Sequence, residues 1–230
     1  MKILALDTAG SACSVTLRTE HGLYTRVEAA NREHSRHVLN MLDQVLVDGA
    51  IKLKDLDLLA WNAGPGSFTG LRIGASVIQA LSYSLALPVL SLSSLELLAH
   101  AAARYVGRAS CNLAVAIDAR MNGVYWGTFR LEDQCVTRLA DDQLISLAEM
   151  ELPWTKGDDA GVWKVAGDAW QLTSLAACGM NPVALETFAE EVVALAISSH
   201  SQDWLYDAAV VPRYIGGIAN WKKRQLRSQS

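Results

Sequence analysis

Ile3-Leu4-Ala5-Leu6-Asp7 is a short apolar run that ends in an aspartate, and the pattern returns halfway along the chain as Ala114-Val115-Ala116-Ile117-Asp118. In both places a turn and two further runs of strand-forming residues follow. A pattern repeated in fixed order predicts two similar domains that each begin with three antiparallel strands, although two such runs also recur by chance in α/β chains. We place the domains at residues 1–104 and 105–230. The further runs are residues 14–17 and 24–27 in the first copy, and 124–129 and 136–139 in the second.

Helix-like and strand-like patterns alternate after the first three runs. Apolar residues at helical spacing between Val38 and Leu46, Leu39 among them, predict a helix that Asn31 can cap and that ends at Gly49. Alternating strands and helices imply parallel pairing, so the chain is assigned to the α/β class. The other expected elements are strands at 56–62, 88–92, 162–166 and 209–214, and helices at 71–87, 146–150 and 187–200.

The composition excludes several classes of protein. Of the 230 residues, 51% are apolar and 19% charged, which gives ample chain for a packed core and excludes a disordered protein. The net charge of −4 argues against a broad nucleic-acid-binding face. Four scattered cysteines without a CxxC pattern suggest neither a disulfide scaffold nor a structural zinc site.

The same features predict a cytoplasmic protein that does not enter a membrane. The first apolar run reaches Asp7 after four residues, which is too short for the core of a signal peptide. The uncharged stretch 73–95 has the length of a membrane span, but serines dilute it and Pro88 divides it. We expect that stretch to be buried inside the protein.

Two loops are candidates for contact with a nucleotide or another anion. Asp7 lies in a turn of small residues that suits phosphate binding in an actin-like fold, but an aspartate that ends a strand is more often a turn residue that accepts backbone N–H bonds. The segment Gly64-Pro65-Gly66-Ser67-Phe68-Thr69-Gly70 lacks the lysine of a phosphate loop and the glycine spacing of a dinucleotide-binding loop. Its N–H groups favour either an anion or tight packing against another element. The candidate anion contacts are Asp7, Thr8, Gly64, Gly66, Ser67, Thr69 and Gly70.

Other polar groups give weaker signals. His34 and His37 lie three residues apart, and the sequence shows no third ligand, so exposed or interface histidines are favoured over a metal pair. No GxSxG motif or reactive cysteine context indicates a nucleophile. The C-terminal Lys222, Lys223, Arg224 and Arg227 are typical of a solvated tail, with RNA contact as the alternative.

Several segments together resemble the bacterial TsaB (YeaZ) family, and the resemblance extends from end to end. It implies an actin/Hsp70/sugar-kinase-like (ASKHA) fold of two ribonuclease-H-like domains, in agreement with the repeat. It also implies a role in making N6-threonylcarbamoyladenosine (t6A) at position 37 of tRNA, beside the paralogous transferase TsaD and the ATPase TsaE. The segments are residues 3–14, Glu33-His34, the run from Gly64 to Gly74, Ile117-Asp118-Ala119-Arg120, Val124-Tyr125-Trp126 and Trp221-Lys222-Lys223.

The resemblance further implies that this chain is not the transferase. TsaD-type proteins carry two metal-binding histidines, and Ser94 and Leu98 stand at the matching positions here. A hydroxyl and an isobutyl group do not replace two imidazoles, so we expect no catalytic residue, no metal site and a scaffolding or activating role. The alternatives are a small-molecule kinase or ATPase of the actin-like superfamily, and an RNA-binding module based on the basic tail.

A scaffold needs a surface for its partner. The resemblance implies that helices near residues 34–47 and 68–87 contact TsaD, or a second copy of the chain when TsaD is absent, while TsaE joins a ternary complex and tRNA is reached indirectly. No tightly bound cofactor is expected, and ATP or ADP is placed at the partner interface. One departure is Gly216, which stands where relatives often carry an arginine. The expected contact positions are His34, His37, Met41, Arg72, Ala75, Ser76 and Gln79.

Overall fold

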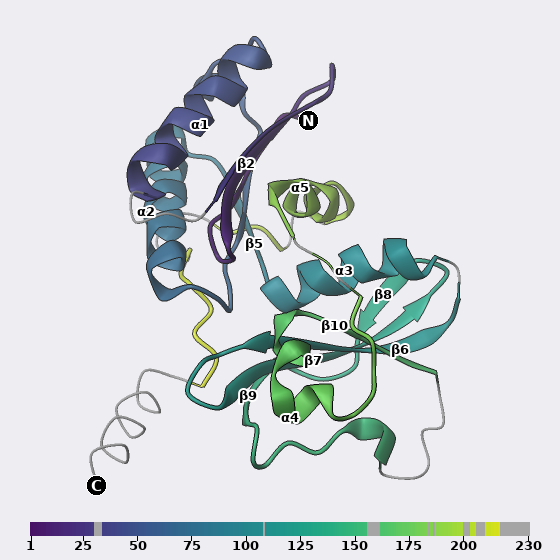
Figure 1. The fold of residues 1–230 in the computed structure, drawn as a ribbon. Coiled ribbons are helices and arrows are strands. Elements are labelled where there is room, and N and C mark those ends of the chain that lie inside the picture. The colour runs from purple at the N-terminus through teal and green to yellow at the C-terminus, as the bar shows by residue number, and fades with distance from the viewer. Residues whose placement is uncertain are drawn as a thin grey trace, which may run out of the picture. The chain divides into compact units, whose positions relative to one another are not determined.

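A computed structural model describes residues 1–29, 34–107, 109–155, 162–183, 185, 187–199, 203–205 and 210–216, with only the backbone described at 34–36 and 173. The predicted Asn31 cap and the basic tail lie outside these residues. Contacts divide the chain into two compact units, and the division falls within helix α3 (Ser94–Val106) (Figure 1). The first unit is Met1–Leu97 with Thr187–Arg213, and the second is Leu98–Glu186 with Tyr214–Ser230.

The first unit is built on a mixed sheet with the strand order β3-β2-β1-β4-β5. β1, β2 and β3 are antiparallel neighbours. β4 pairs with β1 and β5 pairs with β4, and both run parallel to β1. Every residue of β1 and β4 is buried, as expected of strands covered on both faces. The bounds are β1 (Ile3–Asp7), β2 (Ala12–Arg18), β3 (Leu23–Ala29), β4 (Leu58–Asn62) and β5 (Val89–Leu92).

Helices cover both faces of this sheet (Figure 1). Leu4 and Leu6 pack in one core with residues of α1 (His34–Asp48) and α2 (Phe68–Leu85). Ile3 and Ala5 point the other way and pack with α5 (Ala189–Ser198), because successive side chains of a strand alternate between faces. A short 3-10 helix (Leu53–Asp55) leads into β4.

The second unit repeats the first three strands and their parallel neighbour. Its sheet has the order β10-β6-β7-β8, in which β6, β7 and β8 are antiparallel and β10 is parallel to β6, just as β4 is parallel to β1. The predicted repeat is therefore confirmed. The bounds are β6 (Cys111–Asp118), β7 (Gly123–Glu132), β8 (Cys135–Arg138), β9 (Gln143–Ser146), β10 (Trp163–Ala166), α4 (Thr173–Ala176) and 3-10 helices at Pro153–Thr155 and Asp168–Gln171.

Three expectations about the elements are wrong. The helix expected at 146–150 is replaced by strand β9, which pairs with β7, and by a turn in which the Leu147 N–H binds the Asn122 carbonyl. A strand was expected at 209–214, but residues 210–214 are not in a strand. They make isolated hydrogen bonds, such as Arg213 N–H to Ala63 O, instead of a ladder with a neighbouring strand. Helix α3 was not expected at all.

The compact units are also not the two contiguous domains expected from the sequence. The helix expected at 187–200 is present as α5, but its apolar residues, including Val192 and Ala196, pack on the first sheet. A segment late in the chain thus completes the first unit. No helix in the described part of the chain combines the length and the hydropathy needed to cross a membrane. Residues 73–95, considered above as a span, belong to α2, β5 and the start of α3.

Candidate functional site

Asp7 lies at the end of β1 and is buried. Its Oδ1 accepts the Ala9 N–H at 2.9 Å, and its Oδ2 accepts an N–H of Asn62 at 3.0 Å. Burial raises the pKa of Asp7 to about 6, although these two hydrogen bonds lower it and the charge of Glu191 raises it further. The interpretation of Asp7 as a turn residue that accepts a backbone N–H is confirmed.

Asn62 connects this turn to two other segments. It ends β4, and its Oδ1 accepts the Gly64 N–H at 3.0 Å and the Ser94 hydroxyl at 2.7 Å. The Ser94 N–H in turn donates to the Gly64 carbonyl at 3.0 Å. One amide side chain therefore ties together the ends of β1 and β4, the glycine loop and the first residue of α3. Sequence reasoning missed Asn62, although a polar residue that ends a buried strand was a signal for it.

The glycine loop packs against the Asp7 turn through backbone atoms. A Cβ at Gly66 would lie 2.4 Å from the Ala9 carbonyl oxygen, and one at Gly70 would lie 1.9 Å from the Thr8 carbonyl oxygen. The Ser67 N–H donates to the Ala9 carbonyl, and the Thr8 hydroxyl donates to the Gly70 carbonyl, both at 2.8 Å. Close packing thus accounts for these glycines. Contact of this loop with an anion stays a prediction.

Gly64 has a different requirement from the other loop glycines. Its φ of +101° is disfavoured for other residues, and an added Cβ would meet the Leu71 side chain at 2.8 Å. Ser67 caps α2 by accepting the Gly70 N–H at 3.3 Å, while Thr69 is exposed on the first turn. Helix α2 therefore begins directly where the loop meets the Asp7 turn.

An open groove of about 460 Å³ lies between the two helices on the outer side of this site. Leu39 on α1 and Phe68 on α2 contribute large exposed apolar surfaces, with 54% and 55% of each residue accessible. The Arg72 guanidinium lies over the Phe68 ring, 3.9 Å from its centroid, in cation–π geometry. The groove is lined by Leu39, Phe68, Thr69, Arg72, Ile73, Ser76 and Val77.

The structure separates the expected contact positions into two groups. Arg72 and Ser76 are exposed and line the groove. Met41 and Ala75 are instead buried in the core beneath the helices, so they do not belong to the exposed face. Leu39, by contrast, was counted with the apolar positions of the predicted helix and faces solvent. Helical spacing alone did not distinguish these faces, because apolar residues occupy both sides of α1.

The remaining expected contact positions have partners of their own. Gln79 is half-buried and donates from Nε2 to the Val210 carbonyl at 2.6 Å. His37 is partly exposed and pairs with Glu28 of β3, with Nδ1 2.5 Å from Oε2. The side chain of His34 lies outside the described part of the structure. Among the described residues, no group of three or more His, Cys, Asp or Glu side chains is arranged to hold a metal ion.

In the second unit, the turn after β6 has a different structure from the Asp7 turn. Asp118 accepts the Arg120 N–H at 2.7 Å, but Arg120, Met121 and Asn122 all have a positive φ and lie at the surface. Gly216 in the same unit has a φ of +89°, and an added Cβ would lie 2.7 Å from the Leu144 side chain. Backbone conformation and close packing therefore explain why glycine occupies position 216 instead of arginine.

Comparisons with known proteins agree with this architecture. The family model for TsaD, tRNA N6-adenosine threonylcarbamoyltransferase, matches residues 26–200. The Escherichia coli tRNA threonylcarbamoyladenosine biosynthesis protein TsaB is 34% identical over 171 residues, which cover 74% of this chain and 73% of that protein. The Buchnera aphidicola (Schizaphis graminum) protein of the same name is 34% identical over 170 residues, 74% of this chain and 79% of the relative.

A solved structure extends the likeness over nearly the whole chain. YeaZ from Pseudomonas aeruginosa is 31% identical and superposes with a TM-score of 0.78 over 93% of this chain and 99% of its own. The similarity in sequence and the similarity in structure thus point to the same family and to the fold expected from the sequence. The chain belongs to the TsaB (YeaZ) family and has the α/β fold of the YeaZ structure.

Proposed function

We propose that this protein acts in t6A biosynthesis as a non-catalytic subunit that binds a TsaD-type transferase through the groove between α1 and α2. The groove is the observation that carries the proposal. Two relatives that are 34% identical to this chain are tRNA threonylcarbamoyladenosine biosynthesis proteins, which supports the pathway. The proposal includes a cytoplasmic location, TsaE as a third component and ATP or ADP at the shared interface.

The chemistry of the groove suits a protein partner. Exposed apolar side chains beside polar ones, as Leu39 and Phe68 lie beside Arg72 and Ser76, are typical of a surface that contacts another protein. Phe68 and Arg72 belong to the residue types enriched in protein interfaces, and their stacking holds the arginine in place before a partner arrives. Small Ser76, one turn further along α2, leaves room for close approach of another helix.

The polar network beneath the groove supports a scaffolding role. The Ser94 hydroxyl, at a position where the resemblance places a metal-binding histidine in TsaD, donates to Asn62. Both carboxylate oxygens of Asp7 accept hydrogen bonds from the protein itself. These groups hold loops together, which favours a structural role for them over a role in phosphate transfer.

The test introduces a negative charge into the groove at Leu39. Because Leu39 is already 54% exposed, Leu39→Glu should fold normally and weaken binding to TsaD from the same organism at least about 10-fold. The matched control is Leu139→Glu in the second unit, where the leucine is 51% exposed. Binding is measured by chromatography with light scattering, and t6A formation on tRNA by a reconstituted reaction.

The outcomes separate the two parts of the proposal. Equal binding of TsaD by both variants would remove the groove from the interface. Threonylcarbamoyl transfer to tRNA by the purified chain alone would overturn the non-catalytic role. ATP turnover that disappears in Asp7→Ala would instead support a kinase or ATPase.

A further inference from the structure

β3 is the last strand on one side of the first sheet, and no described strand pairs with its outer edge. Open strand edges carry unpaired N–H and C=O groups that can bind another chain, so soluble proteins protect them. β3 is seven residues long and contains the strand-forming sequence Leu23-Tyr24-Thr25, followed by Arg26 and Val27. Leu23 and Val27 are 55% and 47% exposed. Removal of the Arg26 charge would leave the first five residues uncharged.

The hairpin that joins β2 to β3 shows which backbone groups point outward. The Thr19 N–H donates to the Gly22 carbonyl at 2.9 Å, so these two residues form a hydrogen-bonded pair. Pairs along an antiparallel ladder alternate, which makes Thr16 and Thr25 a non-hydrogen-bonded pair. Their hydroxyl oxygens lie only 3.1 Å apart, in agreement with the closer side-chain spacing of such pairs. The backbone groups of Thr25 and of Val27 therefore face the open edge.

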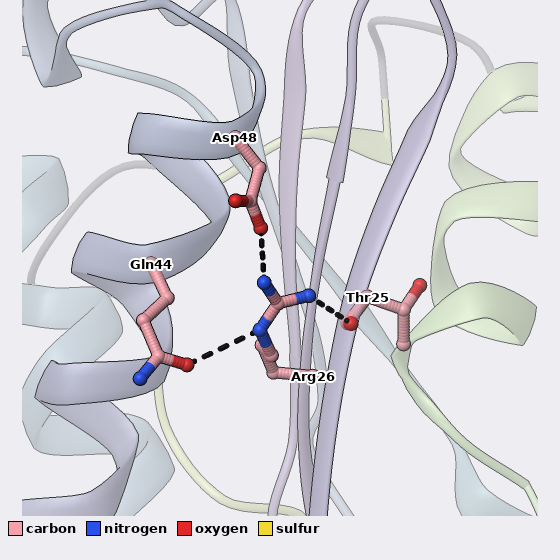
Figure 2. A network of polar contacts seen from close by, with 4 residues as sticks. All are labelled: Thr25, Arg26, Gln44 and Asp48. Carbon is pink, nitrogen blue, oxygen red and sulfur yellow. Dashed lines mark hydrogen bonds and ion pairs between the residues drawn. The ribbon is translucent and has the colours of Figure 1, made fainter.

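The Arg26 side chain binds one of these outward-facing groups, the Thr25 carbonyl (Figure 2). Its NH1 donates to the Thr25 carbonyl at 2.9 Å, while its Nε donates to Gln44 Oε1 at 3.2 Å and its NH2 binds the Asp48 carboxylate. Gln44 and Asp48 lie one turn apart on α1, which holds the guanidinium from the helix side. We call Arg26, Gln44 and Asp48 the Arg26 clamp.

We propose that the Arg26 clamp prevents the open edge of β3 from pairing with β3 of a second copy of this chain. An incoming strand needs the Thr25 carbonyl as an acceptor, and the Arg26 clamp already occupies it. In an antiparallel pair centred on Thr25, Arg26 would lie opposite Tyr24 of the second copy, so the two Arg26 side chains would be diagonal neighbours on the same face, about 7–8 Å apart, where like charges still repel. The second copy is the partner that this edge fits best, because its strand has the same length and alternation.

The experiment removes the clamp and then blocks the edge again. Arg26→Ala should associate at a protein concentration at least about 10-fold lower than the wild-type chain, as measured by light scattering over a concentration series. Asp48→Ala keeps the arginine but loses its anchor, so it should shift association in the same direction and by less. Lys54→Ala, which removes an exposed cation outside the sheet, is the control and should behave like the wild-type chain.

Val27→Pro makes the test specific for the strand edge. The Val27 N–H points outward, so proline there removes a donor from the open edge without breaking a bond to β2. Arg26→Ala/Val27→Pro should therefore return to the wild-type association behaviour, whereas Arg26→Ala/Leu139→Glu, changed at an exposed leucine of the second unit, should not. Wild-type association of both Arg26→Ala and Asp48→Ala, or association that Val27→Pro leaves unchanged, would overturn the proposal. If Arg26→Ala does not fold, Asp48→Ala with and without Val27→Pro decides the question.

Discussion

The turn after β1 and the turn after β6 occupy equivalent places in the two copies of the repeat, yet one is buried and the other lies at the surface. Asp7 is 2% exposed, whereas the side chain of its counterpart Asp118 is 18% exposed and that of Arg120 in the same turn is 84% exposed. Small residues after Asp7 let the glycine loop approach until backbone atoms touch. Bulkier residues after Asp118 leave that turn open. The same strand arrangement thus supports a packed junction in one unit and an exposed tip in the other.

Both copies nevertheless contain a glycine that packs closely against a backbone carbonyl. Gly70 approaches the Thr8 carbonyl in the first unit, and Gly167 approaches the Ala116 carbonyl in the second. In each case a glycine after the parallel neighbour strand lies against the end of the central strand. The two units differ more in their helices, because α4, which follows β10 in the second unit, has four residues, whereas α2, which follows β4 in the first, has 18. The groove is therefore a feature of the first unit.

Gly70→Ala should break the packed junction and produce the largest loss. Its Cβ would lie 1.9 Å from the Thr8 carbonyl oxygen, and backbone must move to make room. We expect a loss of more than about 3 kcal/mol in the free energy of unfolding, although alanine is normally about 1 kcal/mol better than glycine in a helix. The measurement is urea denaturation. Gly10→Ala, with open space around the added methyl, is the control, and equal stability of the two variants would contradict the close approach.

Asp7→Asn should change how stability depends on pH. The pKa of Asp7 rises from 3.8 to about 6 on folding, so the folded chain binds the proton more tightly and stability falls as pH increases from about 4 to about 6. The shift corresponds to about 3 kcal/mol, which the wild-type chain loses across this window and the asparagine variant does not. Denaturation curves at several pH values measure the difference. Asp118→Asn is the control in the open turn, and parallel pH curves for wild type and Asp7→Asn would refute the prediction.

Gly167→Ala tests whether the close packing of a glycine against a backbone carbonyl matters equally in the second unit. Its Cβ would lie 2.1 Å from the Ala116 carbonyl, and its φ is +105°. Because Gly167 is only partly buried, we expect a smaller loss of about 2 kcal/mol, with amide exchange increasing in β6 and β10. Gly179→Ala has a positive φ without a close neighbour, so it should cost only about 1 kcal/mol. A loss of stability for Gly179→Ala that is larger than that for Gly167→Ala would contradict this explanation.

Met121→Gly should change the free energy of unfolding least, and it should stabilise the protein, unlike the other substitutions. Met121 has a φ of +48° and is 61% exposed, so glycine relieves backbone strain without removing buried contacts. Part of the gain is offset by the greater freedom of glycine in the unfolded chain, which leaves a stabilisation of about 0.5 kcal/mol. Thermal unfolding measures it against Met121→Ala, for which no gain is expected. A loss of stability would show that the Met121 side chain contributes to the fold.

Periodicity in the sequence was sufficient to predict the repeat, most strands and the α/β class. Strands such as β1 and β6 are short, apolar and bounded by turn residues, so local physics identifies them. The helix expected at 146–150 was wrong because β9 obtains its conformation from pairing with β7, which is a contact distant in the sequence. α5 was predicted as a helix, but its place on the first sheet follows from an apolar face that can be matched only in three dimensions.

The candidate site shows the same division. Its residue types, an aspartate after a strand and a glycine-rich loop before a helix, were evident from the sequence, and the resemblance carried by these motifs identified the family. Their use was not evident, because packing and anion contact call for the same small residues and free N–H groups. The approach of Gly70 to Thr8, the bond from Asn62 to Ser94 and the exposure of Leu39 arise when distant segments meet. Local sequence specifies which conformations a segment can adopt, whereas tertiary packing selects which of its atoms remain available to a partner.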